Sequence, residues 1–99
     1  MSPRADLALQ IPDTTLVREF DGESVLLNLK NESYFGLDTT GTFIWQRIAE
    51  GRTLKEIEHA LTERFDVDLE TAAQDLHAFV QDLLESQLVE SPDASNPPA

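Results

Sequence analysis

The sequence predicts an α+β fold in which a three-stranded antiparallel meander is followed by a three-helix bundle. Two observations predict it. Short apolar and polar runs separated by turn signals fill the chain up to Leu37, whereas apolar positions at helical spacing, with capping residues, follow Asp38. A three-stranded meander is stable only when another layer covers one face, so the helices are expected to pack on the sheet.

Three segments have the pattern of short strands. Asp21-Gly22 is a two-residue hairpin signal between the first two, and the turn before the third is Lys30-Asn31-Glu32. Two tight connections make an antiparallel meander. The expected strands are Thr15 to Phe20, Ser24 to Leu29 and Ser33 to Leu37.

Three helices follow, each with its own start signal. Asp38, Thr39 and Thr40 offer caps for the first helix, and Gly51 stands at the position after its end. Thr53 with Glu56 forms a capping box before the second helix, and Asp68 can cap the third. The expected ranges are about Gly41 to Glu50, Leu54 to Phe65 and Leu69 to Ser86.

The 99 residues are enough for one domain. We expect a folded part over residues 14–90, a flexible N-terminus over residues 1–13 and a disordered, proline-rich tail over residues 91–99. No apolar run approaches the ~20 residues that span a bilayer, and the N-terminus has no apolar secretory segment. Cysteine is absent. A cytoplasmic protein is the simplest interpretation.

Acidity is the strongest compositional feature, because 19 Asp and Glu face seven Lys and Arg for a net charge of −12. This charge serves either solubility alone or the choice of a cationic partner. Three helices after strands also resemble a winged helix-turn-helix, whose third helix would read DNA. However, no Lys or Arg follows Phe65, so we expect neither nucleic acid nor a membrane as partner.

No catalytic or metal-binding pattern is present. There is no cysteine nucleophile, and the four glycines are too scattered to cradle a phosphate. His59 and His77 fall outside the apolar stripes of their helices and are expected at the surface. Asp66 and Asp68 resemble the start of a calcium loop, but the later glycine and glutamate are missing. We therefore expect no enzyme activity, no metal and no cofactor.

The third strand, Ser33 to Leu37, is expected at an edge of the sheet. It carries no Lys, no Pro and no inward-pointing charge, which are the usual protections of an edge. An unprotected edge is typical of proteins that bind a peptide by adding it as a strand. Alternatively, the rest of the protein covers this edge, one aromatic packs in the core, and Gly36 marks only a bulge.

The sequence resembles the PqqD-like family, also called precursor peptide recognition elements of ribosomally made natural products. The resemblance extends from about Val17 to Val89 and implies a three-stranded sheet followed by a winged-helix-like bundle. It also implies that a precursor leader peptide adds beside the third strand, under the third helix, and is presented to a modifying enzyme or leader peptidase. The matching residues are Leu27-Asn28-Leu29, Tyr34-Phe35-Gly36-Leu37-Asp38, Gly41, Ile44-Trp45, Gly51-Arg52-Thr53, Ile57, Leu61, Phe65-Asp66-Val67, Asp75, Phe79, Leu83 and Leu88-Val89.

The turn before the third strand, and the third strand itself, indicate which subtype of the PqqD-like family the sequence resembles. Residues 29–33 lack the Pro-Glu-Arg-like element of the pyrroloquinoline-quinone members, and residues 34–41 are more similar to the discrete domains of lasso-peptide clusters. Gln87 stands where many relatives have glycine.

Carried over to this sequence, the resemblance gives a peptide site with two walls. The strand wall is residues 34–37, mostly through their main chain, and the helix wall is the part of the third helix that faces this edge. Phe79 is either a pocket wall or plain core, and Asp75 and Asp82 either contact cations or amides of the leader or form a solvated face. A one-residue shift of the strand would exchange Tyr34 for Phe35. An acidic winged-helix adaptor that binds protein without strand addition is the alternative function. The expected site residues are Ser33, Tyr34, Phe35, Gly36, Leu37, Asp75, Ala78, Phe79 and Asp82.

Overall fold

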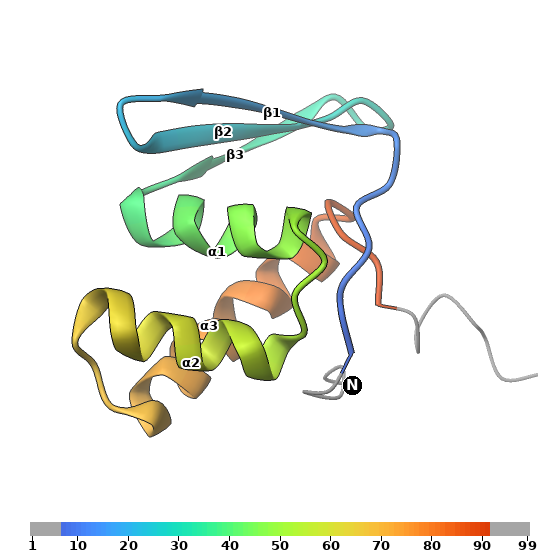
Figure 1. The fold of residues 1–99 in the computed structure, drawn as a ribbon. Coiled ribbons are helices and arrows are strands. Elements are labelled where there is room, and N and C mark those ends of the chain that lie inside the picture. The colour runs from blue at the N-terminus through green and yellow to red at the C-terminus, as the bar shows by residue number, and fades with distance from the viewer. Residues whose placement is uncertain (1–6, 92–99) are drawn as a thin grey trace, which may run out of the picture.

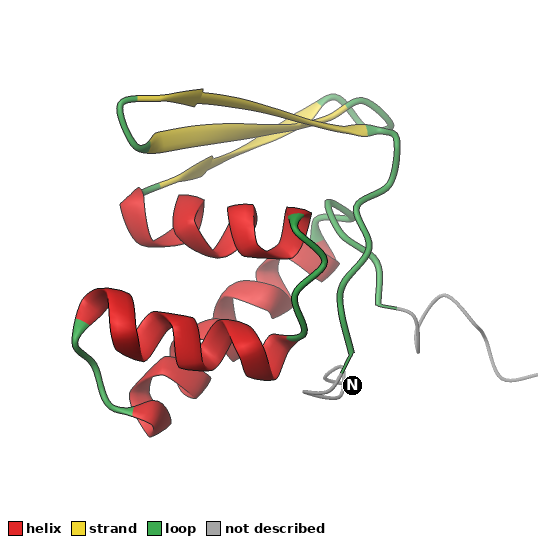
Figure 2. Ribbon diagram, viewed as in Figure 1, coloured by secondary structure: helices red, strands yellow, loops and turns green. Residues whose placement is uncertain are grey.

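The computed structural model describes residues 7–91 and consists of a sheet layer over three helices (Figure 1). The sheet is antiparallel in the order β1-β2-β3, and α1 runs directly beneath it (Figure 2). This confirms the predicted α+β fold class. The elements are β1 (Thr15–Phe20), β2 (Glu23–Asn28), β3 (Ser33–Leu37), α1 (Thr39–Ala49), α2 (Leu54–Phe65) and α3 (Leu69–Glu85).

One face of the sheet packs on the helices and supplies the core. Leu26 at the centre of β2 is fully buried, and its neighbours on that face, Ser24 and Asn28, are buried as well. The hydroxyls of Ser24 and Thr42 form a buried hydrogen bond of 2.8 Å between β2 and α1. The sheet is thus joined to α1 by a polar contact as well as by apolar packing.

The helices are capped by residues that the sequence predicts. The Asp38 carboxylate accepts the amide hydrogen of Gly41 at 2.8 Å, so α1 begins at Thr39, two residues earlier than expected. Thr53 and Glu56 form a complete capping box at α2. Each cap satisfies amide groups that the first helical turn leaves unpaired.

Two helices end in the same hydrogen-bonding motif with different residues at its left-handed position. After α1, Gly51 takes φ +85° and the Arg52 amide donates to the carbonyl of Arg47 at 3.2 Å. After α3, Gln87 takes φ +60° and the Leu88 amide donates to Leu83 at 3.0 Å. The missing glycine at Gln87 therefore leaves the turn geometry intact.

The N-terminal segment is packed over the residues that the structure describes. Leu9 is buried in the core, and Gln10 exchanges two main-chain hydrogen bonds with Glu90, at 2.8 and 2.7 Å. The expected boundary at Thr14 therefore falls inside a packed segment rather than at its start. Ser91 is buried, and the rest of the expected tail lies outside the described residues. Within residues 7–91, no helix is long and apolar enough to cross a membrane.

Candidate functional site

The hydrogen-bonding direction of each strand follows from the first hairpin. Asp21 and Gly22 have φ of +55° and +81°, a two-residue turn whose flanking pair, Phe20 and Glu23, is hydrogen-bonded. At the other end of the hairpin, the Leu29 amide donates to the Thr14 carbonyl at 2.8 Å. This bond confirms that the odd-numbered residues of β2 bond to β1. Successive residues of a strand direct their main-chain groups to alternate sides. The even-numbered residues of β2 therefore pair with β3.

The same alternation leaves two residues of β3 unpaired at the sheet edge. Ser33, Phe35 and Leu37 lie opposite the even-numbered residues of β2 and bond to them. The amide and carbonyl groups of Tyr34 and Gly36 consequently point away from the sheet. Within residues 7–91, β3 pairs only with β2, so this row of donors and acceptors is open.

Side chains of β3 divide between the two faces. Tyr34 lies opposite Leu27 on the outer face and is 77% exposed. Phe35 lies opposite Leu26 on the helix-facing side and is half-buried against the core. Leu37 is buried, so its side chain serves the core and is closed to a guest peptide. Of the two aromatic residues of β3, Phe35 therefore faces the helices and Tyr34 faces away from them.

Phe79 on α3 reaches the point where β3 ends and α1 begins. A β-carbon added to Gly41 would lie 3.3 Å from both Phe79 Cε1 and Leu37 Cβ, which is closer than ordinary contact. Glycine at this position thus lets the Phe79 ring approach α1. Phe79 is half-buried, so it is at once part of the core and open along one side.

The remaining residues expected on the helix wall are exposed on the same flank of α3. Asp75, Ala78 and Asp82 all lie at the surface. Asp75 and Asp82 are four and three residues from Phe79, so these three share one side of the helix, with Ala78 next to Phe79. In Figure 1, α3 passes behind α1. The structure thus places Phe79 beside the end of β3 and makes Asp75, Ala78 and Asp82 accessible.

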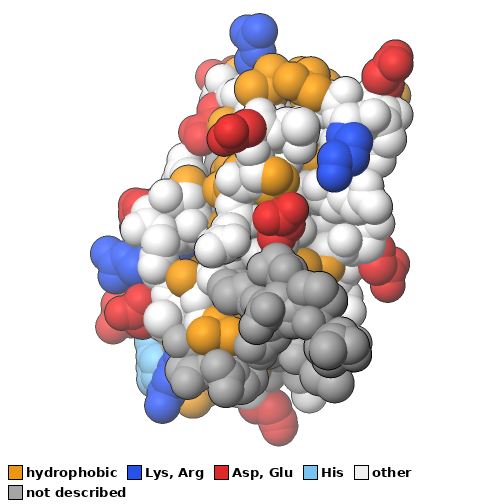
Figure 3. Space-filling model, turned by 90° about the vertical axis from the view of Figure 1, so that its right-hand side faces the viewer, with side chains coloured by type: hydrophobic (Ala, Val, Ile, Leu, Met, Phe, Trp, Pro, Cys, Tyr) orange, Lys and Arg blue, Asp and Glu red, His pale blue; other side chains and the backbone are white. Residues whose placement is uncertain are grey.

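The outer face of the sheet carries several exposed apolar side chains. Leu16, Phe20 and Leu29 are 43%, 57% and 56% exposed, and Tyr34 belongs to the same face. Hydrophobic side chains gather at the sheet end of the molecule in Figure 3. Leu16 lies opposite Leu27 in the sheet. The alternation of residues in β1 and β2 places these apolar side chains on one face, and this alternation can be seen in the sequence.

No group of three or more His, Asp or Glu residues among residues 7–91 is arranged to hold a metal ion. What the β3 edge offers is a row of main-chain hydrogen-bonding groups beside two half-buried aromatic rings, Phe35 and Phe79.

The family model described as coenzyme PQQ synthesis protein D (PqqD) matches residues 23–89, which is more than half of the chain. The chain belongs to the PqqD family. This confirms the resemblance found in the sequence. No curated protein matches the chain significantly.

Two solved structures have the same fold as this PqqD-family chain. "TbiB1 in Complex with the TbiA(beta) Leader Peptide" is 37% identical with a TM-score of 0.79, and the match covers 82% of this chain and 94% of that one. "Lasso peptide synthetase B1 complexed with the leader peptide" is 26% identical with a TM-score of 0.76, covering 83% and 96%. Both were solved with a leader peptide bound, and both span nearly their whole length in the alignment.

Proposed function

We propose that this PqqD-family domain is a non-catalytic recognition element that binds the leader of a ribosomally made precursor peptide. It presents the bound precursor to a modifying enzyme or leader peptidase of a lasso-peptide type cluster. The observation that carries the proposal is the open main-chain edge of β3 in a chain 37% identical to a leader-bound TbiB1. An unprotected edge of this kind suits strand addition.

In the proposed complex the leader adds as a fourth strand beside β3. Tyr34 and Gly36 each supply one amide donor and one carbonyl acceptor to it. Phe35 and Phe79 supply apolar surface for leader side chains that point under the sheet. Main-chain bonds give affinity in this mode, and the side-chain pockets give specificity.

The acidic flank of α3 completes the proposed site. Asp75 and Asp82 are exposed on either side of Phe79 along the helix, and Ala78 leaves room between them. No Lys or Arg follows Phe65 in the chain, so α3 carries no Lys or Arg beside these carboxylates. A leader that carries Lys or Arg beside its apolar anchors matches this flank.

A proline scan of the two sheet edges tests strand addition. Tyr34→Pro removes an amide that points out of the sheet and leaves every bond between β2 and β3 in place. The probe is the TbiA(beta) leader, the peptide bound in the structure that is 37% identical to this chain. We expect Tyr34→Pro to weaken leader binding by tenfold or more, because an added strand loses at least one main-chain bond of about 1 kcal/mol and meets the ring.

Two controls separate main-chain pairing from other effects. Tyr34→Thr removes the exposed ring but keeps the amide, so it should bind nearly as the native protein does. Val17→Pro introduces a proline at the opposite edge of the sheet, where Val17 also directs its amide away from β2. Unchanged binding by Tyr34→Pro, or leader-induced amide shifts confined to the helices, would instead support an adaptor that binds without strand addition.

A further inference from the structure

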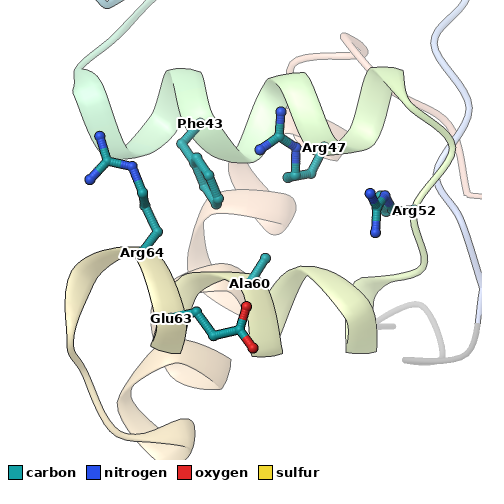
Figure 4. A pocket seen from close by; sticks show the side chains of 6 residues that line it. All are labelled: Phe43, Arg47, Arg52, Ala60, Glu63 and Arg64. Carbon is teal, nitrogen blue, oxygen red and sulfur yellow. The ribbon is translucent and has the colours of Figure 1, made fainter.

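The few cations of this acidic chain are concentrated at one place. The sequence has seven Lys and Arg, and three of them line a single hollow of about 390 Å³ between α1 and α2. Figure 4 shows side chains from both helices and from their connection around it. No lining residue belongs to β3 or α3, so the hollow is separate from the proposed leader site. The lining residues are Phe43, Arg47, Arg52, Ala60, Glu63 and Arg64.

An aromatic pair orients two of the three guanidinium groups. Phe43 and Phe65 meet edge to face with their ring centroids 5.4 Å apart. The Arg47 guanidinium carbon lies 4.6 Å from the Phe43 centroid, and that of Arg64 lies 5.1 Å from the Phe65 centroid. A guanidinium held on a ring face still presents its N–H donors around its own plane, where a carboxylate can accept two of them.

Internal carboxylates use only part of this donor capacity. Glu50 accepts from Arg47 Nη2 at 2.8 Å and lies 3.4 Å from Arg52 Nε. Arg47 Nε is buried and has no acceptor among the described residues, which is an unfavourable state for a charged donor. Glu63 lines the hollow but, within residues 7–91, pairs with none of the three arginines. The Arg64 guanidinium is exposed, and no ion pair between described residues uses it, so its donors are available to a ligand.

We propose that this hollow binds the carboxylates of an acidic segment of a protein partner. A carboxylate in the hollow can accept from the exposed Arg64 guanidinium, and its planar pair of oxygens fits an arginine fork. Nucleic acid or an anionic bilayer fits poorly, because an extended polyanion must also meet the other carboxylates of a chain with net charge −12. A short acidic segment reaches only the hollow, and its binding leaves the β3 edge accessible.

The test uses an acetylated, amidated Glu-Glu-Leu-Glu-Glu peptide and the full chain labelled with ¹⁵N. We expect saturable shifts of the Arg47 and Arg64 Nε–Hε signals and of the Phe43 amide, with no shifts on β3. A Gln-Gln-Leu-Gln-Gln peptide should produce none of them. Equal shifts with the glutamine peptide would overturn the proposal, and so would tighter saturable binding of a DNA duplex or of anionic vesicles at the same residues.

A matched pair of variants separates the hollow from net charge. Arg64→Gln removes an exposed lining guanidinium, and we expect about a tenfold loss of affinity for the acidic peptide, since one charge-assisted bond is lost. Lys55→Gln makes the same charge change on α2 without lining the hollow, and should bind within about twofold of the native chain. Equal losses in both variants would show that overall charge alone attracts the peptide and would overturn the proposal. Because these residues take no part in leader binding, the result is independent of the proposed function.

Discussion

Asn28 on β2 donates a hydrogen bond of 2.9 Å from its side-chain amide to the main-chain carbonyl of Ser86, directly after α3. The same amide lies 3.3 Å from the carbonyl of Gln87, while the Asn28 side-chain oxygen accepts the Lys30 amide at 2.9 Å. Asn28 is 1% exposed, so its side-chain ends of these bonds are buried. One buried side chain thus fixes the end of α3 to the sheet and shapes the turn that leads into β3.

Asn28→Ala is expected to destabilise the protein by about 1–3 kcal/mol, because it leaves a buried carbonyl without its donor. Urea unfolding followed by tryptophan fluorescence measures the change through Trp45, which is buried in the core. Asn31→Ala is the control, since Asn31 makes its bonds to Ser33 at the exposed surface and should change stability little. Equal effects of the two substitutions would contradict a special role for Asn28.

Gln87→Gly is expected to stabilise the protein by about 0.5–1 kcal/mol. Gln87 holds φ +60° in a turn where glycine meets no steric penalty, and this gain exceeds the entropy that glycine adds to the unfolded chain. The reverse change at the equivalent turn, Gly51→Gln, should be destabilising for the same reason, because Gly51 has φ +85° and open space around it. Thermal unfolding of both variants measures the two changes in stability. Loss of stability in Gln87→Gly would mean that the Gln87 side chain contributes a contact that outweighs its strain.

Local signals in the sequence were sufficient to predict the strands and helices of this fold. Turn glycines, the Thr53–Glu56 capping box and helical apolar spacing are short-range features, and each predicted its element to within about two residues. The packing of Leu9 was missed because a seven-residue segment without periodicity gives no sign of the long-range pairing of Gln10 with Glu90. Such pairing depends on tertiary context, which overrides local pattern.

The candidate site was predictable only in part. That β3 is an edge followed from the order of the strands, but which of its aromatics faces the helices depended on a phase of one residue. The approach of Phe79 to Gly41 joins residues 38 positions apart and had no signal in the sequence beyond the glycine itself. The arginine hollow likewise appears only when α1 and α2 are packed against each other.

The start of α3 is expected to make stability sensitive to acid. The Asp68 carboxylate accepts the Thr71 amide hydrogen at 2.7 Å, and this main-chain bond, together with one from the Thr71 hydroxyl, lowers the pKa of Asp68. A carboxyl whose pKa is lower in the folded state stabilises the fold above its unfolded pKa, and loses that contribution as pH falls through the folded value. The contribution should therefore be complete above about pH 4 and disappear at lower pH.

Asp68→Asn, which caps a helix without titrating near pH 4, isolates this effect. We expect the native chain to lose Tm relative to Asp68→Asn as the pH is lowered from about 6 to 2.5, across the range in which Asp titrates. Asp75→Asn removes an exposed carboxylate from the same helix and corrects for the change in net charge. A constant difference in Tm between the native chain and Asp68→Asn over that range would contradict the assignment.

The acidic flank of α3 is expected to add charge attraction to leader binding. Asp75→Asn combined with Asp82→Asn should weaken binding of a cationic leader about two- to tenfold, because each exposed ion pair contributes only about 0.2–1 kcal/mol. The loss should shrink as salt is raised from about 0.05 to 0.5 M, since screening already removes these interactions in the native chain. Fluorescence anisotropy of a labelled leader measures both. Glu70→Gln combined with Glu90→Gln, the same charge change at other exposed positions, is the control, and equal weakening by the two pairs would mean that Asp75 and Asp82 form only a solvated face.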